Sequence, residues 1–165
     1  MAPPAMEPEV LDVPSALFGP LRVPADTCIH FPDGLLGYAV QERFVLLPAA
    51  PEGVYWLQSC DEGSLAFLLV DPFAFVPEYA VDFPDDHAVA VGGDAPGDVV
   101  VLGIVTLPRA PGELSTVNLQ GPLVLNLRTR TGCQRVSDTN AFGTRHPLAL
   151  EQFLRRGSSS RSTRR

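Results

Sequence analysis

The amino-acid sequence predicts an all-β fold, a small closed or partly open antiparallel β-barrel with a short C-terminal helix. Short apolar runs, mostly rich in β-branched and aromatic residues, recur along the chain. Turn formers such as Pro51-Glu52-Gly53 and Thr131-Gly132 separate these runs. Short strands at this spacing are typical of β-sandwiches and barrels, and closure of a barrel removes the sheet edges that promote aggregation.

Taken in order, the predicted strands span residues 43–48, 54–59, 64–72, 79–83, 98–108, 115–120, 122–130 and 133–138. The strand at 122–130 alternates cleanly, with Leu123, Leu125 and Leu127 on one face, so we expect it to bury that face. The segment HPLALEQFLRR, which starts at residue 146, has apolar side chains at helical spacing and predicts the C-terminal helix.

The chain divides into one domain and two tails. Its 165 residues, 45% of them hydrophobic, fit a single domain with a real core. Residues 1–16 are acidic and interrupted by prolines, which predicts a disordered N-terminal tail. Residues 155–165, RRGSSSRSTRR, predict a disordered Arg-rich tail. We therefore expect a single β-barrel-like domain over residues 17–154, and a monomer.

Hydropathy and charge indicate where the protein works. The apolar runs fall short of the about 18–20 residues that a membrane span needs, and the first residues lack the pattern of a signal peptide, so we expect a cytoplasmic protein with no membrane partner. The net charge is −7, with −14 over residues 1–108 and +7 over residues 109–165. The acidic body argues against direct nucleic-acid binding, although the Arg-rich tail leaves nucleic-acid binding as an alternative.

No catalytic or metal-binding motif assembles in the sequence, which predicts a protein that is not an enzyme and has no cofactor. Cys28, Cys60 and Cys133 lie far apart without a CxxC motif, so we expect three reduced, mostly buried thiols rather than a zinc site or disulfides. One alternative is a small-ligand-binding or hydrolytic barrel in which Cys60 is a nucleophile beside Asp61 and His30 or His146 is the base.

Three polar residues stand in unusual places. Asp71 follows an apolar run and precedes Pro72, where a carboxylate is expected to cap a turn. Asn118 and Asn126 lie in predicted strands, from which Asn is depleted. A buried amide bonded to the backbone and a contact with a partner remain open as interpretations of both asparagines.

The segment FPDGLLGY, residues 31–38, combines turn formers with apolar side chains. Gly34 and Gly37 are expected to let the backbone turn sharply. Leu35, Leu36 and Tyr38 would then be core or rim residues of that corner, or part of a surface that binds a partner.

This segment opens a series of motifs that resembles a known family. It is followed by Leu57-Gln58-Ser59, Asp71-Pro72-Phe73 and TVNLQGPLVLN at residues 116–126, and then by Gln134. In this order and spacing the series is similar to the FliW flagellar assembly factor family, over residues 20–148. Tyr38 stands where the family often has Phe, and Gly121 where it often has Ala.

The resemblance implies a small β-barrel-like protein without catalytic activity. Members of the family bind flagellin in the cytoplasm and antagonise the translational regulator CsrA (carbon storage regulator A), which couples flagellin synthesis to export. The candidate partner-binding residues on this basis are Phe31, Leu35, Leu36, Tyr38, Gln58, Asp71, Phe73, Asn118, Gln120 and Asn126.

Overall fold

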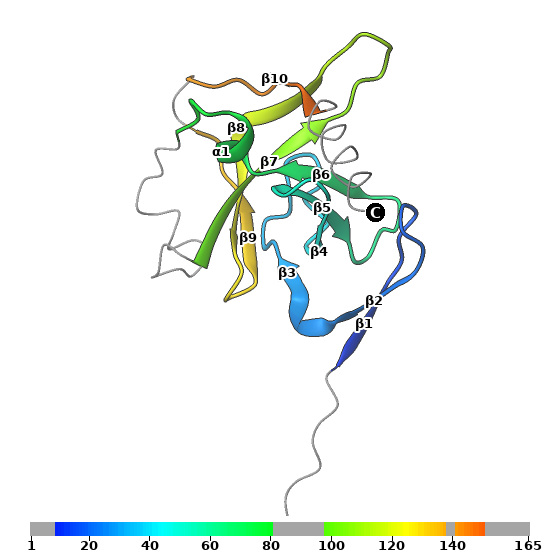
Figure 1. Ribbon diagram of the computed structural model, residues 1–165. Coiled ribbons are helices and arrows are strands. Elements are labelled where there is room, and N and C mark those ends of the chain that lie inside the picture. Colours follow the sequence, from blue (N-terminus) through cyan, green and yellow to red (C-terminus); the bar gives the residue numbers. More distant parts are fainter. Residues whose placement is uncertain (1–8, 81–97, 138–140, 151–165) are drawn as a thin grey trace, which may run out of the picture.

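The computed structural model describes residues 9–80, 98–137 and 141–150, and within these ranges the fold is a β-barrel (Figure 1). The barrel strands are β3 (Cys28–His30), β4 (Arg43–Pro48), β5 (Val54–Ser59), β6 (Ala66–Val70), β7 (Val99–Thr106), β8 (Ser115–Asn126) and β9 (Thr131–Gln134). Each pairs with its neighbour in an antiparallel ladder, except that β9 meets β3 in parallel. Because β8 pairs with both β7 and β9, the sheet closes on itself. The predicted fold class is confirmed.

Strand β8 is one long strand where the sequence predicts two. The expected break at Gly121-Pro122 falls where β8 bulges against β7, between the pairs Leu102↔Leu123 and Ile104↔Asn118. Proline has no amide hydrogen to donate to the neighbouring strand, and a bulge is a position in a sheet where that hydrogen bond is not needed. The strand therefore bends at these residues and continues to Asn126.

Two buried clusters lie on opposite faces of the barrel sheet, because neighbouring residues such as Leu68 and Leu69 of β6 belong to different clusters. One contains Phe31, Phe44, Leu57, Leu102 and Leu123, and lies beneath the loop between β3 and β4. The other gathers residues of β5 to β8 with β10 (His146–Leu148) and packs against the short helix α1 (Pro72–Phe75). Apolar side chains alternate along the strands to reach these clusters, as a period of two requires.

A two-stranded ribbon covers a third cluster outside the barrel. Strands β1 (Val10–Val13) and β2 (Leu21–Pro24) pair antiparallel and lead through a 3-10 turn, η1 (Ala25–Thr27), into β3 (Figure 1). Val13 is buried against Val45. The prediction of a disordered tail over residues 1–16 is therefore wrong at β1. There the alternating apolar side chains of the segment VLDV pack inward, although prolines lie on either side. Residues 1–8 lie outside the described ranges.

Other local predictions also differ from the structure. Helix α1 was not predicted. A strand was predicted over residues 79–83, but Tyr79 and Ala80 are not in a strand, and residues 81–83 lie outside the described ranges. Residues 146–148, predicted as helix, form β10 against the start of β8, where Leu148 is buried. The rest of the predicted C-terminal helix and the Arg-rich tail fall almost entirely in residues 151–165, outside the described ranges.

No helix among the described residues is long and apolar enough to cross a membrane.

The contact between β9 and the loop that follows β3 yields a first prediction. A Cβ atom on Gly132 would lie 2.7 Å from two ring atoms of Phe31 and 2.8 Å from Leu125 Cδ2. Because both neighbours are buried, Gly132→Ala should lower the free energy of unfolding by about 1–3 kcal/mol, measured by urea denaturation. Gly143→Ala is the control, since the nearest atom to its added Cβ is 3.9 Å away. Equal stability of the two variants would contradict the packing described here.

Candidate functional site

The loop that joins β3 to β4, residues 31–42, is called the corner below. Phe31 begins it and is fully buried, with its ring edge-on to Phe44 at a centroid distance of 5.3 Å. The amide of Gly34 donates to the carbonyl of Phe31 over 2.9 Å and closes the first turn. The first residue of the corner is thus part of the barrel core.

Two glycines allow the corner to reverse direction. Gly34 and Gly37 have φ angles of 63° and 85°, in the left-handed region that other residues rarely adopt. A Cβ on Gly34 would also lie 2.7 Å from Ala39 Cα. Around Gly37, the amide of Tyr38 donates to the carbonyl of Leu35 over 2.7 Å. The predicted turning role of both glycines is confirmed.

Within residues 35–40, the corner buries one large apolar side chain and exposes three. Leu35 is 2% exposed, whereas Leu36, Tyr38 and Val40 are 65%, 43% and 86% exposed. We call these three residues the corner patch. The ring of Tyr38 packs edge-on against Phe67 at 5.3 Å, and Phe67 in turn lies beside Phe44 of the core. The patch therefore rests on an aromatic stack that continues into the barrel.

Hydrogen bonds from strands β8 and β9 fix the backbone of the corner patch. The amide of Leu36 donates to Gln134 Oε1, and Gln134 Nε2 donates to the carbonyl of Gly121, both over 2.9 Å. Asn118 Oδ1 accepts from the amides of Gln120 and Gly121 over 3.1 and 2.9 Å. Asn118 and Gly121 of β8, Gln134 of β9 and the corner thus form one hydrogen-bonded chain.

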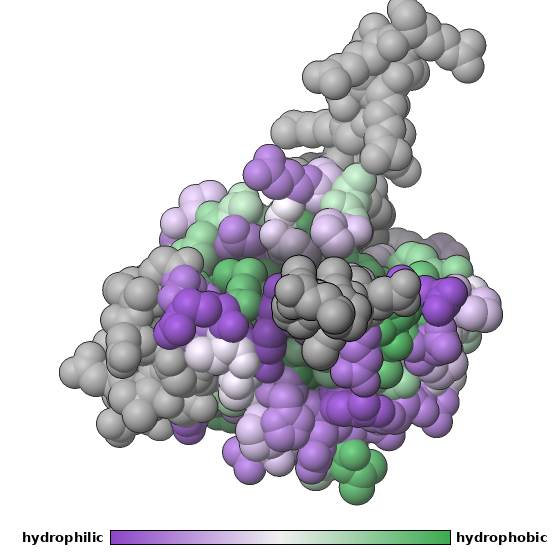
Figure 2. Space-filling view, turned by 90° about the horizontal axis from the view of Figure 1, so that it is seen from below, coloured by the Kyte–Doolittle hydropathy of each residue, from purple (hydrophilic) through white to green (hydrophobic). Residues whose placement is uncertain are grey.

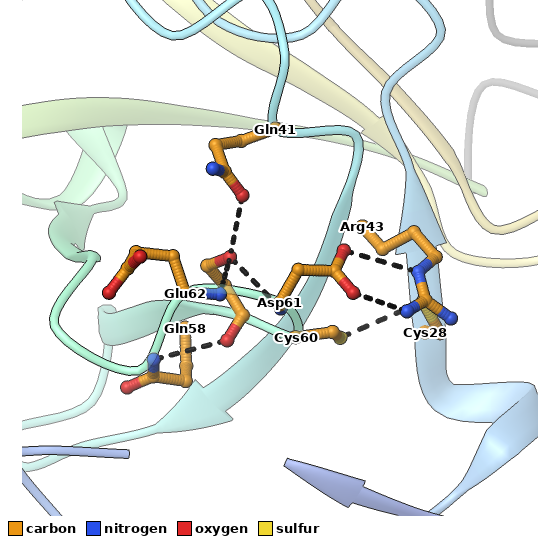
Figure 3. A network of polar contacts seen from close by, with 8 residues as sticks. Cys28, Gln41, Arg43, Gln58, Cys60, Asp61 and Glu62 are labelled. Atoms are coloured by element: carbon orange, nitrogen blue, oxygen red, sulfur yellow. Dashed lines mark hydrogen bonds and ion pairs between the residues drawn. The ribbon is translucent and has the colours of Figure 1, made fainter. Parts of the chain in front are cut away.

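A second polar network fixes the far end of the corner (Figure 3). The hydroxyl of Ser59 donates to Gln41 Oε1 over 3.1 Å and accepts from the amides of Asp61 and Glu62. Arg43, the first residue of β4, forms a two-bond ion pair with Asp61, and this partner raises the pKa of the guanidinium. The corner is anchored at both of its ends.

A small cavity lies between the corner and β9. It has a volume of about 220 Å³ and is lined by residues 33–37, Ala39 and residues 133–135. This is smaller than the about 300–1,000 Å³ typical of small-molecule sites. Arg135 and Asp33 bring opposite charges to it, and Arg135 Nε is a buried donor without a partner among the described residues. The cavity is therefore of a size that suits a single side chain rather than a typical metabolite.

Other predicted site residues serve the fold. Gln58 is fully buried; it accepts from the Ser15 hydroxyl and donates to the carbonyls of Ser59, Gly63 and Leu65. Asn126 Oδ1 accepts from the amides of Arg128 and Thr129 in the turn after β8. A buried amide whose oxygen is bonded to the backbone is thus confirmed for Asn126, whereas Asn118 makes the same kind of bonds but is only half-buried. Gln120 lies half-buried in β8, and its carbonyl accepts from Ser137.

Asp71 and Phe73 lie away from the corner, on the other core cluster. Asp71 Oδ1 accepts from the amide of Phe73 over 3.0 Å and caps α1, as predicted. Phe73 is half-exposed with its ring 5.3 Å from that of Tyr79, which belongs to the cluster beneath α1. The structure therefore does not join Phe73 to the corner patch.

Among the described residues, no hydrogen bond joins Cys60 to either histidine of the alternative catalytic site. His30 Nε2 lies 3.4 Å from Glu42, and His146 Nε2 lies 3.9 Å from Glu78. Burial, together with the nearby Cys28 thiol, raises the pKa of Cys60 to about 12, which keeps it protonated at neutral pH. Within residues 9–80, 98–137 and 141–150, no group of three or more His, Cys, Asp or Glu side chains is arranged to hold a metal ion.

The thiols are free, but two of them are not far apart. Cys28 Sγ and Cys60 Sγ lie 3.9 Å from each other, although 32 residues separate them in the sequence. The spacing of cysteines along the chain could not reveal this, because the pairing of β3 and β5 with β4 creates the contact.

The surface around these features is mixed in character. Figure 2 shows one face on which hydrophilic side chains predominate and hydrophobic ones appear in small separate groups. The exposed residues of the corner patch, Leu36, Tyr38 and Val40, come from six consecutive positions of the chain, 35–40. Sequence reasoning missed Val40 and the roles of Gln134 and Ser59; Gln134 belongs to the motif series, but only the register of β9 reveals its contact.

Comparison with known proteins finds one family. A family model described as FliW protein matches residues 12–148. The chain is similar to the flagellar assembly factor FliW of Treponema denticola, at 31% identity over 141 residues that cover 86% of this chain and 95% of the relative. It is also similar to that of Moorella thermoacetica, at 34% identity over 144 residues that cover 87% and 91% of the two chains.

A solved structure agrees with these sequence matches. A crystal structure of the flagellar assembly factor FliW superimposes with a TM-score of 0.74 at 26% sequence identity. The match covers 82% of this chain and 95% of the other.

The bond between Leu36 and Gln134 yields a second prediction. Gln134→Ala removes the acceptor of the Leu36 amide, and a hydrogen bond of this kind contributes about 1 kcal/mol, or roughly fivefold in an equilibrium. Hydrogen exchange at the Leu36 amide should therefore accelerate several-fold. The amide of Leu57, in the middle of β5, serves as an internal control that should not change. Unchanged exchange at Leu36 would show that Gln134 does not hold the corner.

Proposed function

The chain belongs to the FliW family of flagellar assembly factors, which confirms the resemblance carried by its motifs, and we propose that it binds flagellin in the cytoplasm and antagonises the translational regulator CsrA. In this proposal flagellin that has not been exported occupies the protein. The regulator is then released and represses flagellin translation. Export of flagellin reverses these steps, so that the rate of flagellin synthesis is matched to the rate of export. Simple mass action between two competing partners is sufficient for such a switch.

The observation that carries the proposal is the corner patch. It presents Leu36 and Val40 to solvent on a backbone that hydrogen bonds hold at both ends. Exposed apolar side chains on a rigid support lose little conformational entropy on binding, which favours them as anchors of a protein interface. Among the predicted contact residues, Leu36 and Tyr38 would meet the partner, while Phe31 and Leu35 would support them from the core.

The polar groups support a binding role rather than a catalytic one. Asp71 caps a helix, Gln58 has both of its amide atoms bonded, and Cys60 is a protonated thiol next to a second thiol. Each of these groups is already used by the fold. We therefore propose that the protein acts as a monomer through its surface and not as an enzyme.

The acidic charge of the chain supports binding to the second proposed partner, CsrA. The chain has a net charge of −7, and −14 of charge lies in residues 1–108. A regulator that holds RNA must present basic groups to phosphate, and complementary charges speed the encounter of two proteins. The same acidity opposes direct binding of nucleic acid by the body of this protein.

The proposal is tested by size-exclusion chromatography with the flagellin of the same organism. The two proteins should co-elute as a stable complex at micromolar concentrations. Replacing an apolar anchor by a charge should cost more than about 1.4 kcal/mol, so Leu36→Asp and Val40→Asp should each weaken the complex at least about tenfold. Leu114→Asp is the matched control, because Leu114 is 56% exposed but lies in the turn between β7 and β8.

Two results would contradict the proposal at different levels. If flagellin elutes alone beside the unaltered protein, flagellin binding is not a property of this chain. If the complex forms but resists both corner substitutions while Leu114→Asp abolishes it, the chain binds flagellin through the β7–β8 turn instead. Addition of purified CsrA to the complex then tests whether the two partners compete.

A further inference from the structure

The contact between Cys28 and Cys60 has no role in the proposed function. The two sulfur atoms lie 3.9 Å apart, and both residues belong to the third cluster, beneath the β1–β2 ribbon. Strand β4 lies between them: Cys28 pairs with Val45, and the amide of Cys60 donates to the carbonyl of Arg43 over 3.0 Å. The two side chains thus meet across β4 on the same side of the sheet.

Both cysteines lie at the ends of elements, where small shifts are easiest. Cys28 is the first residue of β3 and directly follows the 3-10 turn η1. Cys60 comes just after Ser59, the last residue of β5. A disulfide bond requires the sulfur atoms to approach to about 2.05 Å. Because β4 lies between the two residues, the bond also requires the start of β3 and the end of β5 to move toward each other.

The two thiols differ in a way that suits a stepwise reaction. Cys28 is half-buried and can meet a small oxidant, whereas Cys60 is buried. Burial and the neighbouring Cys28 raise the pKa of Cys60, which disfavours its thiolate and leaves Cys28 as the thiol that meets the oxidant first. Cys133 lies apart on β9, where Arg135 and Asp33 are the charged groups that act on its thiol.

We propose that Cys28 and Cys60 form an oxidation site in which hydrogen peroxide converts the two thiols into an intramolecular disulfide. The Cys28 thiolate attacks one peroxide oxygen, which breaks the O–O bond, gives a sulfenic acid and releases hydroxide. Cys60 loses its proton and its sulfur attacks the sulfur of Cys28, which expels the hydroxyl oxygen as water. Two thiols are oxidised and one peroxide is reduced to two water molecules. A dithiol reductant reverses the change.

The position of the bond gives it a structural consequence. Ser59, whose hydroxyl holds Gln41 of the corner, immediately precedes Cys60. Asp61, the partner of Arg43, immediately follows it. The disulfide would therefore form within the network that anchors the far end of the corner (Figure 3).

The test is mass spectrometry of the full chain after treatment with hydrogen peroxide, without reduction. Trypsin cleaves after Arg22, Arg43 and Arg109, so the two cysteines fall in separate peptides, residues 23–43 and 44–109. We expect the intact chain to lose two hydrogen atoms and these two peptides to be linked. The Cys133→Ser variant should give the same link, and dithiothreitol should remove it.

Variants at the two cysteines keep the proposal falsifiable. Cys28→Ser should leave Cys60 unlinked and unoxidised, because it removes the accessible thiol. Cys60→Ser should let Cys28 proceed to sulfinic acid, a gain of two oxygen atoms, because no thiol is left to trap the sulfenic acid. The proposal is overturned if the unaltered chain gives sulfinic acid without a link, a link that contains Cys133, or no reaction at oxidant concentrations that modify free cysteine.

Discussion

The pairing of β8 with both β7 and β9 is the constraint on which the structure depends. It closes the barrel, and it places β9 beside the loop that follows β3. From that position Gly132 leaves space for the ring of Phe31, and Gln134 accepts the amide of Leu36. The core and the exposed part of the corner are thus set by the same two strands, which explains why a bulged β8 with glycine and proline at its bend belongs to this fold.

The corner patch follows from that constraint. A loop with two residues of positive φ and three exposed apolar side chains is costly in isolation, because apolar surface in water and an ordered backbone both oppose folding. Two hydrogen-bonded anchors and the stack from Tyr38 through Phe67 to Phe44 offset this cost. In the proposed function a partner covers these apolar groups, which would explain why the fold holds them in water.

Local patterns in the sequence predicted much of this structure. The strands at 43–48 and 54–59, the cap by Asp71 and the turning role of Gly34 were all accessible, because each depends on neighbours within a few residues. The features that the sequence did not predict depend on residues far apart in the chain. β1 was hidden by prolines, β10 was assigned to a helix, and neither the contact of Gln134 with Leu36 nor that of Cys28 with Cys60 has any local signature.

The most direct test of the central claim is hydrogen exchange of this protein with and without its flagellin, read by mass spectrometry. The claim is that a rigid apolar corner is the surface that meets flagellin. It predicts added protection in peptides that contain residues 35–40 and no change in those from residues 107–114, where Leu107 and Leu114 are also exposed. Protection confined to residues 107–114 or to α1, with the corner unchanged, would contradict it.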